Sequence, residues 1–304
     1  MIIAVFPGQG SQTPGFLEPW LRLDGTRERL GEYSEWAGVD LIAAGTAWDA
    51  DRIRDTQVAQ PLIVAASLLS WGALTDRSGF AGVAGHSVGE FAAAAAAGIL
   101  SEEQALRLVG IRGRAMAEAA AAEQTGMSAI IGGDEAVNVA RLAELDLTPA
   151  NYNGGGQLVA AGALDALQAL AAHPPAGTRV IPLQVAGAFH TRFMGPALDA
   201  LRRAAATIAP SDPAITVWSN RDGASVASGS EFLDSLVDQV ASPVRWDLCM
   251  ASFAAENVGG IVELSPAGTL TGLAKRALRG VPSVAVKTPD DLSAAQALLS
   301  GAEA

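Results

Sequence analysis

The stretch from Phe80 to Glu90 constrains the fold of this chain more than any other part of its sequence. A short apolar segment, a turn and the start of an alanine-rich segment predict a buried strand, an abrupt turn and a helix. In the turn, Gly85, Ser87 and Gly89 form a G-x-S-x-G pattern, which on such a unit holds a serine hydroxyl above the sheet edge on a strained backbone. Because glycine has no Cβ, it allows the strand and the helix to approach closely. The chain has 33 glycines, so this weak pattern needs support from its context.

The composition limits the classes of protein to consider. With 304 residues, the chain can form one large domain or two ordinary ones. Half of the residues are hydrophobic but only 5% are aromatic, which favours close helix–sheet packing of small side chains. The net charge of −12 argues against nonspecific nucleic-acid binding. One cysteine and three histidines exclude an internal disulfide and argue against a metal site, and Cys249 is predicted to be a small core residue.

Neither a membrane span nor a secretion signal is expected. No apolar run reaches the roughly 18 residues that a transmembrane helix needs. The segment Met1–Phe6 lacks a basic leader and a cleavage site. We expect a soluble, cytoplasmic protein.

The first half of the chain predicts the start of a parallel sheet. Residues 2–6 read as a strand that runs into the polar loop 7–12, which contains Gln9 between two glycines. Such a loop presents backbone N–H groups at the carboxyl end of the sheet, the usual ligand side. Helices are predicted over 26–37 and over 62–69, and the second is apolar on every side, so it must be buried.

Between residues 124 and 188 the elements become short and closely spaced, in the order βαββαβ of the ferredoxin-like motif. The strands are expected at 128–131, 147–151, 158–161 and 179–185, and the helices at 134–145 and 163–172. The predicted fold is therefore α/β. A large domain (1–123 and 189–304) has a mainly parallel sheet and a serine nucleophile elbow, and a small ferredoxin-like domain (124–188) is inserted into it.

The remaining elements follow local signals. Residues 220–223 (Asn-Arg-Asp-Gly) predict a tight turn after a strand at 215–219. Ser230 is predicted to cap a helix, and residues 243–246 to open another. A strand over 260–264 is followed by a leucine-rich helix.

One arginine is placed where a charge is costly. Ser101 and Gln104 form a capping box that opens a helix through about Ala122. Arg112 falls on the same stripe of that helix as Val109 and the other apolar residues. A guanidinium on a core-facing stripe needs an anion, which is either a ligand or an internal carboxylate.

The three histidines differ in their expected roles. Serine needs a base to become a nucleophile, and imidazole is the usual one at neutral pH. His86 adjoins Ser87 but should point away from it, as a packing or hydrogen-bonding residue, and His173 precedes two prolines in a polar connection and should be exposed. His190 lies at the junction of the two predicted domains, where ligand sites are common, so it is the candidate base. The alternative is a solvent-facing helix-cap histidine.

Eight motifs in one order carry a family resemblance. They are 6–12 (FPGQGSQ), Gln57 with Gln60-Pro61, 85–90 (GHSVGE), Arg112-Gly113, 151–153 (NYN), 188–190 (AFH), 243–246 (PVRW) and 263–266 (ELSP). With them the chain resembles malonyl-CoA:acyl carrier protein transacylases, and the acyltransferase domains of polyketide synthases, over essentially its whole length.

The resemblance implies a two-stage acyl transfer. Ser87 would take malonyl from malonyl-CoA with His190 as base, and the pantetheine thiol of an acyl carrier protein would then receive it. The backbone N–H groups of Gln9 and Val88 would hold the oxyanion, and Arg112 would bind the malonyl carboxylate with two hydrogen bonds.

Further roles are implied for three residues. Phe189 before the histidine and the aliphatic Val88 after the serine resemble the pattern of family members that select malonyl. A bulky ring leaves little room for an α-methyl group, so malonyl is expected over methylmalonyl. Asn153 is a candidate for substrate binding. The family orients the histidine with a backbone carbonyl, which would lie here near Arg245.

The resemblance also implies the partners. Malonyl-CoA is the substrate, and no bound cofactor or metal is expected. Carrier proteins are acidic, so docking needs a local basic patch, either Lys275, Arg276 and Arg279 or Arg192, Arg202 and Arg203. The alternative for each cluster is that it is simply a solvated helix face with no partner. No feature of the sequence requires an oligomer, so a monomer is expected. The sequence does not distinguish a role in fatty-acid synthesis from one in polyketide synthesis.

Two other classes compete with this interpretation. A patatin-like lipase pairs its serine with an Asp-Gly aspartate, and Asp222-Gly223 is present, although a turn explains that pair as well. The Ser, acid, His order of α/β-hydrolases fits poorly, because much of the chain follows His190. A noncatalytic protein that binds carrier protein is the third class.

Overall fold

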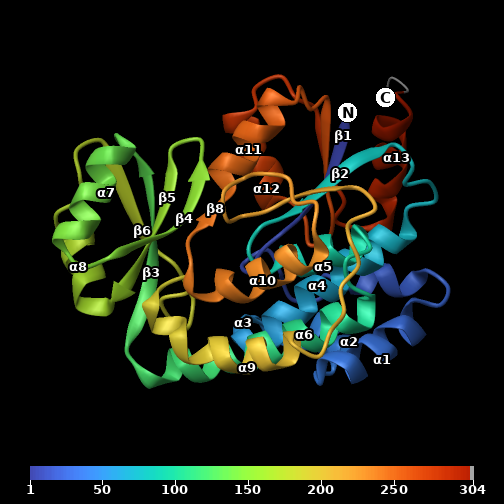
Figure 1. Cartoon of the computed structure of the whole chain (residues 1–304), viewed down its shortest axis with the longest axis horizontal. Coiled ribbons are helices and arrows are strands. Elements are labelled where there is room, and N and C mark those ends of the chain that lie inside the picture. Colours follow the sequence, from blue (N-terminus) through green and yellow to red (C-terminus); the bar gives the residue numbers. More distant parts are fainter. Residues whose placement is uncertain (302–304) are drawn as a thin grey trace.

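The computed structural model describes residues 1–301, which form two five-stranded sheets with helices packed around them (Figure 1). The large sheet is parallel throughout, in the order β10-β9-β1-β2-β7. Its strands are β1 (Ile2–Phe6), β2 (Phe80–Gly85), β7 (Thr216–Trp218), β9 (Gly260–Glu263) and β10 (Ser283–Ala285). The predicted α/β fold with a mainly parallel sheet is confirmed.

The small sheet is mixed and lies to one side of the molecule with its two helices (Figure 1). The elements run β3 (Thr125–Gly132), α7 (Glu135–Glu144), β4 (Thr148–Gly154), β5 (Gln157–Ala163), α8 (Leu164–Ala172) and β6 (Thr178–Pro182), the βαββαβ order expected from the sequence. A fifth strand, β8 (Val244–Arg245), pairs in parallel with β4. Residues 243–246 were predicted to open a helix, but Val244 and Arg245 add a strand to the small sheet, and the helix begins only at Trp246.

Eleven further α-helices pack around the large sheet and its connections in the described residues. They are α1 (Thr26–Ala37), α2 (Leu41–Thr46), α3 (Ala50–Arg54), α4 (Thr56–Ala73), α5 (Gly89–Ala96), α6 (Glu102–Ala122), α9 (Gly195–Ala205), α10 (Gly229–Asp238), α11 (Trp246–Ala255), α12 (Thr269–Ala277) and α13 (Leu292–Ser300). Short 3-10 helices cover Glu18–Arg22, Arg192–Met194, Gln239–Ala241 and Pro289–Asp291. No helix within residues 1–301 combines the length and the apolar character needed to cross a bilayer.

Two helix starts differ from the prediction. Helix α4 begins at Thr56, because Asp55 caps it by accepting from the Gln57 N–H, so Pro61 lies inside the helix. Helix α10 begins at Gly229, because the cap is Ser228, whose hydroxyl accepts from the Glu231 N–H, and Ser230 lies in the first turn. The capping box at Ser101 forms as predicted.

The strand-turn-helix unit of β2 and α5 depends on very close backbone approach. A Cβ added to Gly85 would lie 2.1 Å from the carbonyl carbon of Gly89, and one added to Gly89 would lie 2.2 Å from the carbonyl oxygen of Phe6. Helix α5 packs against both β1 and β2. The two glycines of the pattern are therefore required by packing, as the sequence predicts.

Gly89→Ala should unfold more easily than the wild type, because its new Cβ overlaps backbone that cannot move aside. We expect a loss of about 3 kcal/mol or more in the free energy of unfolding, measured by urea denaturation. Gly31→Ala in α1 is the matched control, since a Cβ there meets nothing within 4 Å. The control should gain up to about 1 kcal/mol. Equal stability of the two variants would contradict this account of the turn.

Candidate active site

A cavity of about 280 Å³ lies at the carboxyl ends of β1 and β2, with walls from both sheets. The large-sheet side contributes Gln9, Ser87 and Val88, and the small sheet contributes Asn153 and Val159, among others. Among residues 1–301, Arg112 is the only charged residue that lines the cavity, and no aspartate or glutamate does. A protein with 32 acidic residues thus presents a cavity whose single formal charge is positive.

Ser87 and His190 meet in this cavity. Ser87 sits in the turn between β2 and α5 at a φ of 52°, and His190 has a φ of 61°, so both are non-glycine residues in the left-handed region. The Ser87 Oγ lies 2.7 Å from the Nε2 of His190. The chain thereby brings together two residues 103 positions apart in a geometry suited to proton transfer.

The other ring nitrogen of His190 fixes its tautomer. Nδ1 lies 2.8 Å from the backbone carbonyl of Gln239, which can only accept a hydrogen bond. Nδ1 therefore carries the proton and Nε2 accepts from the Ser87 hydroxyl. The expectation for Arg245 is wrong. Its guanidinium pairs with Asp247 and lies over the Tyr152 ring, and the carbonyl that orients His190 belongs to Gln239.

His190 is held in its neutral form. The side chain is buried, and burial together with the nearby charge of Arg112 lowers the pKa of His190 to about 3. A neutral imidazole with a free lone pair on Nε2 can accept a proton from serine at neutral pH.

Arg112 projects from α6 into the cavity and is only 1% exposed. Its Nη2 donates to the side-chain oxygen of Gln239 at 3.1 Å and approaches the Ser87 Oγ at 3.5 Å, while its Nε has no partner. No carboxylate in the described residues forms an ion pair with Arg112, so the internal salt bridge is not found. Burial lowers the pKa of Arg112 to about 10, which leaves the guanidinium charged at neutral pH.

Two residues of the cavity lining have backbone donors that are unpartnered in the described part of the chain. Gln9 and Val88 both line the cavity. Neither N–H finds an acceptor within residues 1–301, although Val88 immediately follows Ser87 and begins the turn into α5. Free N–H groups beside a serine hydroxyl are suited to hold a developing oxyanion.

The other predicted residues fall on the cavity wall or away from it. Phe189 lines the cavity and is buried. The side-chain oxygen of Asn153 accepts from the Nε2–H of His86 at 2.9 Å, and the His86 ring packs edge-on against Trp246. His86 is therefore the packing and hydrogen-bonding residue that was expected. His173 is exposed, as predicted.

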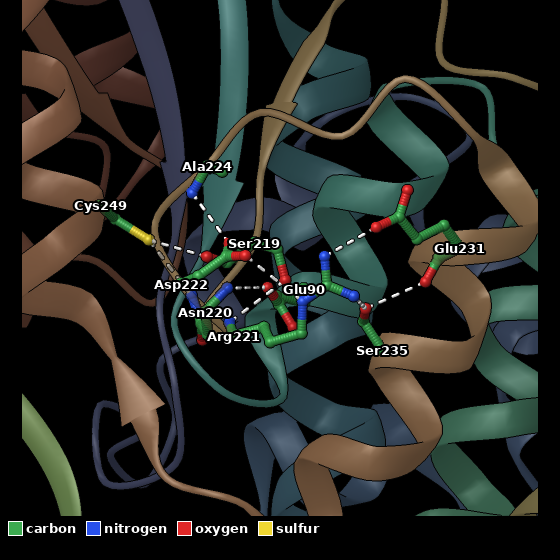
Figure 2. A network of polar contacts seen from close by, with 9 residues as sticks. All are labelled: Glu90, Ser219, Asn220, Arg221, Asp222, Ala224, Glu231, Ser235 and Cys249. Atoms are coloured by element: carbon green, nitrogen blue, oxygen red, sulfur yellow. Dashed lines mark hydrogen bonds and ion pairs between the residues drawn. The ribbon is translucent and has the colours of Figure 1, made fainter.

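A buried polar network lies behind the cavity, and no local sequence pattern indicates a functional role for its members. The carboxyl group of Glu90 accepts from the backbone N–H of Asn220 at 2.6 Å and from the side-chain amide of Gln239. The Asn220 side chain accepts from the Ser87 N–H and donates to the Gly85 carbonyl, both at 2.7 Å. Figure 2 shows Glu90 beside Asn220, together with the further polar contacts of residues 219–235 around them. Through the Asn220 side chain, this network holds the turn that carries Ser87 on the side away from the cavity.

Asp222 and Cys249 lie outside the cavity lining. Asp222 accepts from the Ala224 N–H in the tight turn, which Gly223 closes by donating to the Ser219 carbonyl. The lipase alternative has no support in this geometry. Cys249 is a buried core residue, as predicted, and burial raises the pKa of its thiol. Within residues 1–301, no three histidine, cysteine or acidic side chains cluster as metal ligands would.

The class of protein is defined by a family comparison. The family model of the acyl transferase domain matches residues 4–292. The chain therefore belongs to the acyl transferase family.

Particular relatives narrow this class. The chain is 54% identical to the malonyl CoA-acyl carrier protein transacylase of Mycobacterium tuberculosis (strain H37Rv), over 96% of this chain and 98% of the relative. It is 35% identical to the enzyme of the same name from Escherichia coli (strain K12), over 96% and 97%.

Solved structures agree in fold. The crystal structure of MCAT from Mycobacterium tuberculosis matches with a TM-score of 0.93 at 54% identity, covering 97% of this chain and 99% of that one. A type II PKS acyl-carrier protein in complex with its malonyl-transacylase matches with a TM-score of 0.89 at 32% identity, covering 97% and 98%.

The buried neutral state of His190 predicts a dependence of stability on pH. A histidine whose pKa is lower in the folded state stabilises the fold fully above its unfolded pKa of about 6.5, and this contribution falls as the pH drops toward the folded value. From about pH 7 to about pH 5, the free energy of unfolding of the wild type should fall by about 2 kcal/mol more than that of His190→Gln. Urea denaturation at both pH values measures this difference. Equal losses in the two proteins would show that His190 is not held neutral.

Proposed function

We propose that this protein transfers the malonyl group of malonyl-CoA to the phosphopantetheine thiol of an acyl carrier protein, through a malonyl ester on Ser87. The observation that carries the proposal is a serine hydrogen-bonded to a neutral histidine, in a cavity where Arg112, which has no ion pair, is the only charged group among the described residues. The names of the relatives point to the same reaction.

The first stage forms the ester. The Ser87 oxygen attacks the thioester carbonyl while Nε2 of His190 takes the hydroxyl proton, and the carbonyl of Gln239 stabilises the ring by accepting from Nδ1. The tetrahedral oxyanion accepts from the N–H groups of Gln9 and Val88. As the C–S bond breaks, His190 returns the proton to the sulfur of CoA.

The second stage repeats these steps with a new thiol. His190 takes the proton of the carrier's pantetheine thiol, the sulfur attacks the malonyl ester, and the Ser87 oxygen leaves with the proton. Every step uses groups of a single chain, so the proposal needs neither a bound cofactor nor a second subunit.

Arg112 selects the acyl group. A malonyl unit differs from acetyl by one carboxylate, and a buried guanidinium with unused donors binds a carboxylate strongly. Phe189 and Val88 narrow the space beside the acyl group and favour malonyl over methylmalonyl. Asn153 is a further candidate for substrate binding, because it lines the same cavity and its side chain is held by His86 and Gln157.

The carrier protein docks on the basic patch of Lys275, Arg276 and Arg279. These residues are exposed and form no ion pair within residues 1–301, and α12, which carries Lys275 and Arg276, also contributes Thr269, Leu270 and Leu273 to the cavity wall. In the other candidate patch, Arg192 pairs with Asp146 and Arg202 pairs with Asp238, so much of that charge is already matched.

Mixing the protein with malonyl-CoA should give a covalent malonyl adduct on Ser87, detected by mass spectrometry of the intact protein and its peptides. Ser87→Ala should give none, and His190→Ala should slow adduct formation by roughly two orders of magnitude or more. Asp222→Ala is the control and should form the adduct normally.

Other results would favour the competing classes. No adduct in the wild type would favour a noncatalytic protein, and loss in Asp222→Ala alone would favour the lipase.

When malonyl-CoA and methylmalonyl-CoA compete in one mixture, the malonyl adduct should dominate. Equal amounts would contradict the role of Phe189.

Charge reversal of the patch tests docking. Lys275→Glu with Arg276→Glu should slow malonyl transfer to the carrier about tenfold at low salt, relative to transfer to free pantetheine. Arg202→Glu is the matched control, because its charge is already paired. Equal effects on carrier and pantetheine would exclude this patch as the docking surface.

A further inference from the structure

Gln239 stands between a buried carboxyl group and the buried guanidinium. Its side-chain nitrogen donates to Oε2 of Glu90, and its side-chain oxygen accepts from Nη2 of Arg112 at 3.1 Å. Glu90 is 1% exposed and Gln239 is 5% exposed, so water cannot easily replace either bond. The amide therefore links two ionisable groups that do not touch.

The orientation of this amide is determined by Glu90. A carboxyl oxygen that faces an amide nitrogen accepts its hydrogen, whereas two oxygens facing each other would repel. The other oxygen of Glu90 accepts from the backbone N–H of Asn220 at 2.6 Å, and backbone cannot rotate to exchange its donor. Glu90 thus requires the amide nitrogen of Gln239 on its side, which places the amide oxygen toward Arg112.

An amide oxygen holds a guanidinium without neutralising it. A carboxylate in the same place would form a direct buried ion pair with Arg112 and compete with any carboxylate brought by the substrate. The amide oxygen of Gln239 therefore leaves the positive charge of Arg112 available in the cavity.

We propose that Glu90 and the side chain of Gln239 are positioning residues that aim Arg112 into the cavity while keeping it free of an ion pair, and so set the preference for a carboxylated acyl group. This inference rests on the proposed role of Arg112 as the carboxylate-binding residue. It assigns Gln239 two separate tasks, because its main-chain carbonyl orients His190 and its side chain orients Arg112.

Two variants change the side chains and leave the main-chain carbonyl in place. Glu90→Gln keeps the shape, but its amide can offer an oxygen to only one of the two donors. Since the Asn220 N–H is fixed, Gln239 must turn its own nitrogen toward Arg112, and two donors then face each other. Gln239→Glu puts a carboxylate directly on Arg112.

The measurement is the rate of Ser87 acylation by malonyl-CoA divided by the rate by acetyl-CoA. Hydrogen bonds to charged groups are strong enough that we expect this ratio to fall about tenfold or more in both variants. A residue with only a structural role would lower both rates together and leave the ratio unchanged.

Glu263→Gln is the matched control. Glu263 is also fully buried and accepts from backbone N–H groups, those of Gly268, Leu270 and Thr271, but it has no contact with Arg112 or Gln239. Its variant should lose stability in urea denaturation and keep the malonyl-to-acetyl ratio of the wild type.

Arg112→Ala distinguishes a failure of the proposed role of Arg112 from a failure of the roles inferred for Glu90 and Gln239. If it leaves the ratio unchanged, the proposed role of Arg112 fails, and the inference fails with it. If Arg112→Ala abolishes the preference but Glu90→Gln and Gln239→Glu retain it while remaining folded, then only the inference is overturned.

Discussion

The arrangement of this site depends on a charge buried without a countercharge. Taking the guanidinium of Arg112 out of water costs several kcal/mol unless its donors are satisfied, and an ion pair would be the usual solution. Here the protein supplies one amide oxygen, a distant hydroxyl and the face of Phe91, and leaves the Nε without a partner. The unmet donors fit the proposed binding of an anion that arrives with the substrate, and no acidic side chain from residues 1–301 lines the cavity to compete with it.

A rigid frame is needed to hold such a site. Ser87 and His190 both adopt left-handed backbone conformations, which cost of order 1 to 3 kcal/mol each for non-glycine residues. The strain at Ser87 persists because Gly85 and Gly89 let β1, β2 and α5 pack backbone to backbone, and because Asn220 bonds to the turn on two sides. The parallel sheet therefore serves as the fixed support from which the serine is presented.

The sequence predicted the parts of the site that local patterns encode. The glycine spacing predicted the turn at Ser87, and the apolar stripe of one helix indicated that Arg112 is buried. Gln239, Asn220 and Glu90 were missed as functional residues, because their roles arise from contacts between distant segments, 49 positions apart for Gln239 with His190 and 149 for Gln239 with Glu90. The same limit applies to β8, since two residues become a strand only when the edge of β4 is beside them. The predicted helix over 62–69 begins earlier, at Thr56, because the cap at Asp55 precedes the apolar run.

The groups that orient His190 and Arg112 carry no charge, which suits a substrate that is itself an anion. A carboxylate behind His190 would orient the ring as well as a carbonyl does, but it would add a negative charge close to the place where the malonyl carboxylate binds. The protein uses the Gln239 carbonyl for His190 and the Gln239 amide for Arg112, so one uncharged residue orients both. The carboxyl group that anchors this residue, Glu90, lies one side chain further from the cavity and accepts from the Gln239 side chain. In the described part of the chain, the acid nearest to this cavity, Glu90, therefore lies behind Gln239, and the one charged group on the wall is Arg112. This arrangement suits a cavity that accepts an anionic acyl group.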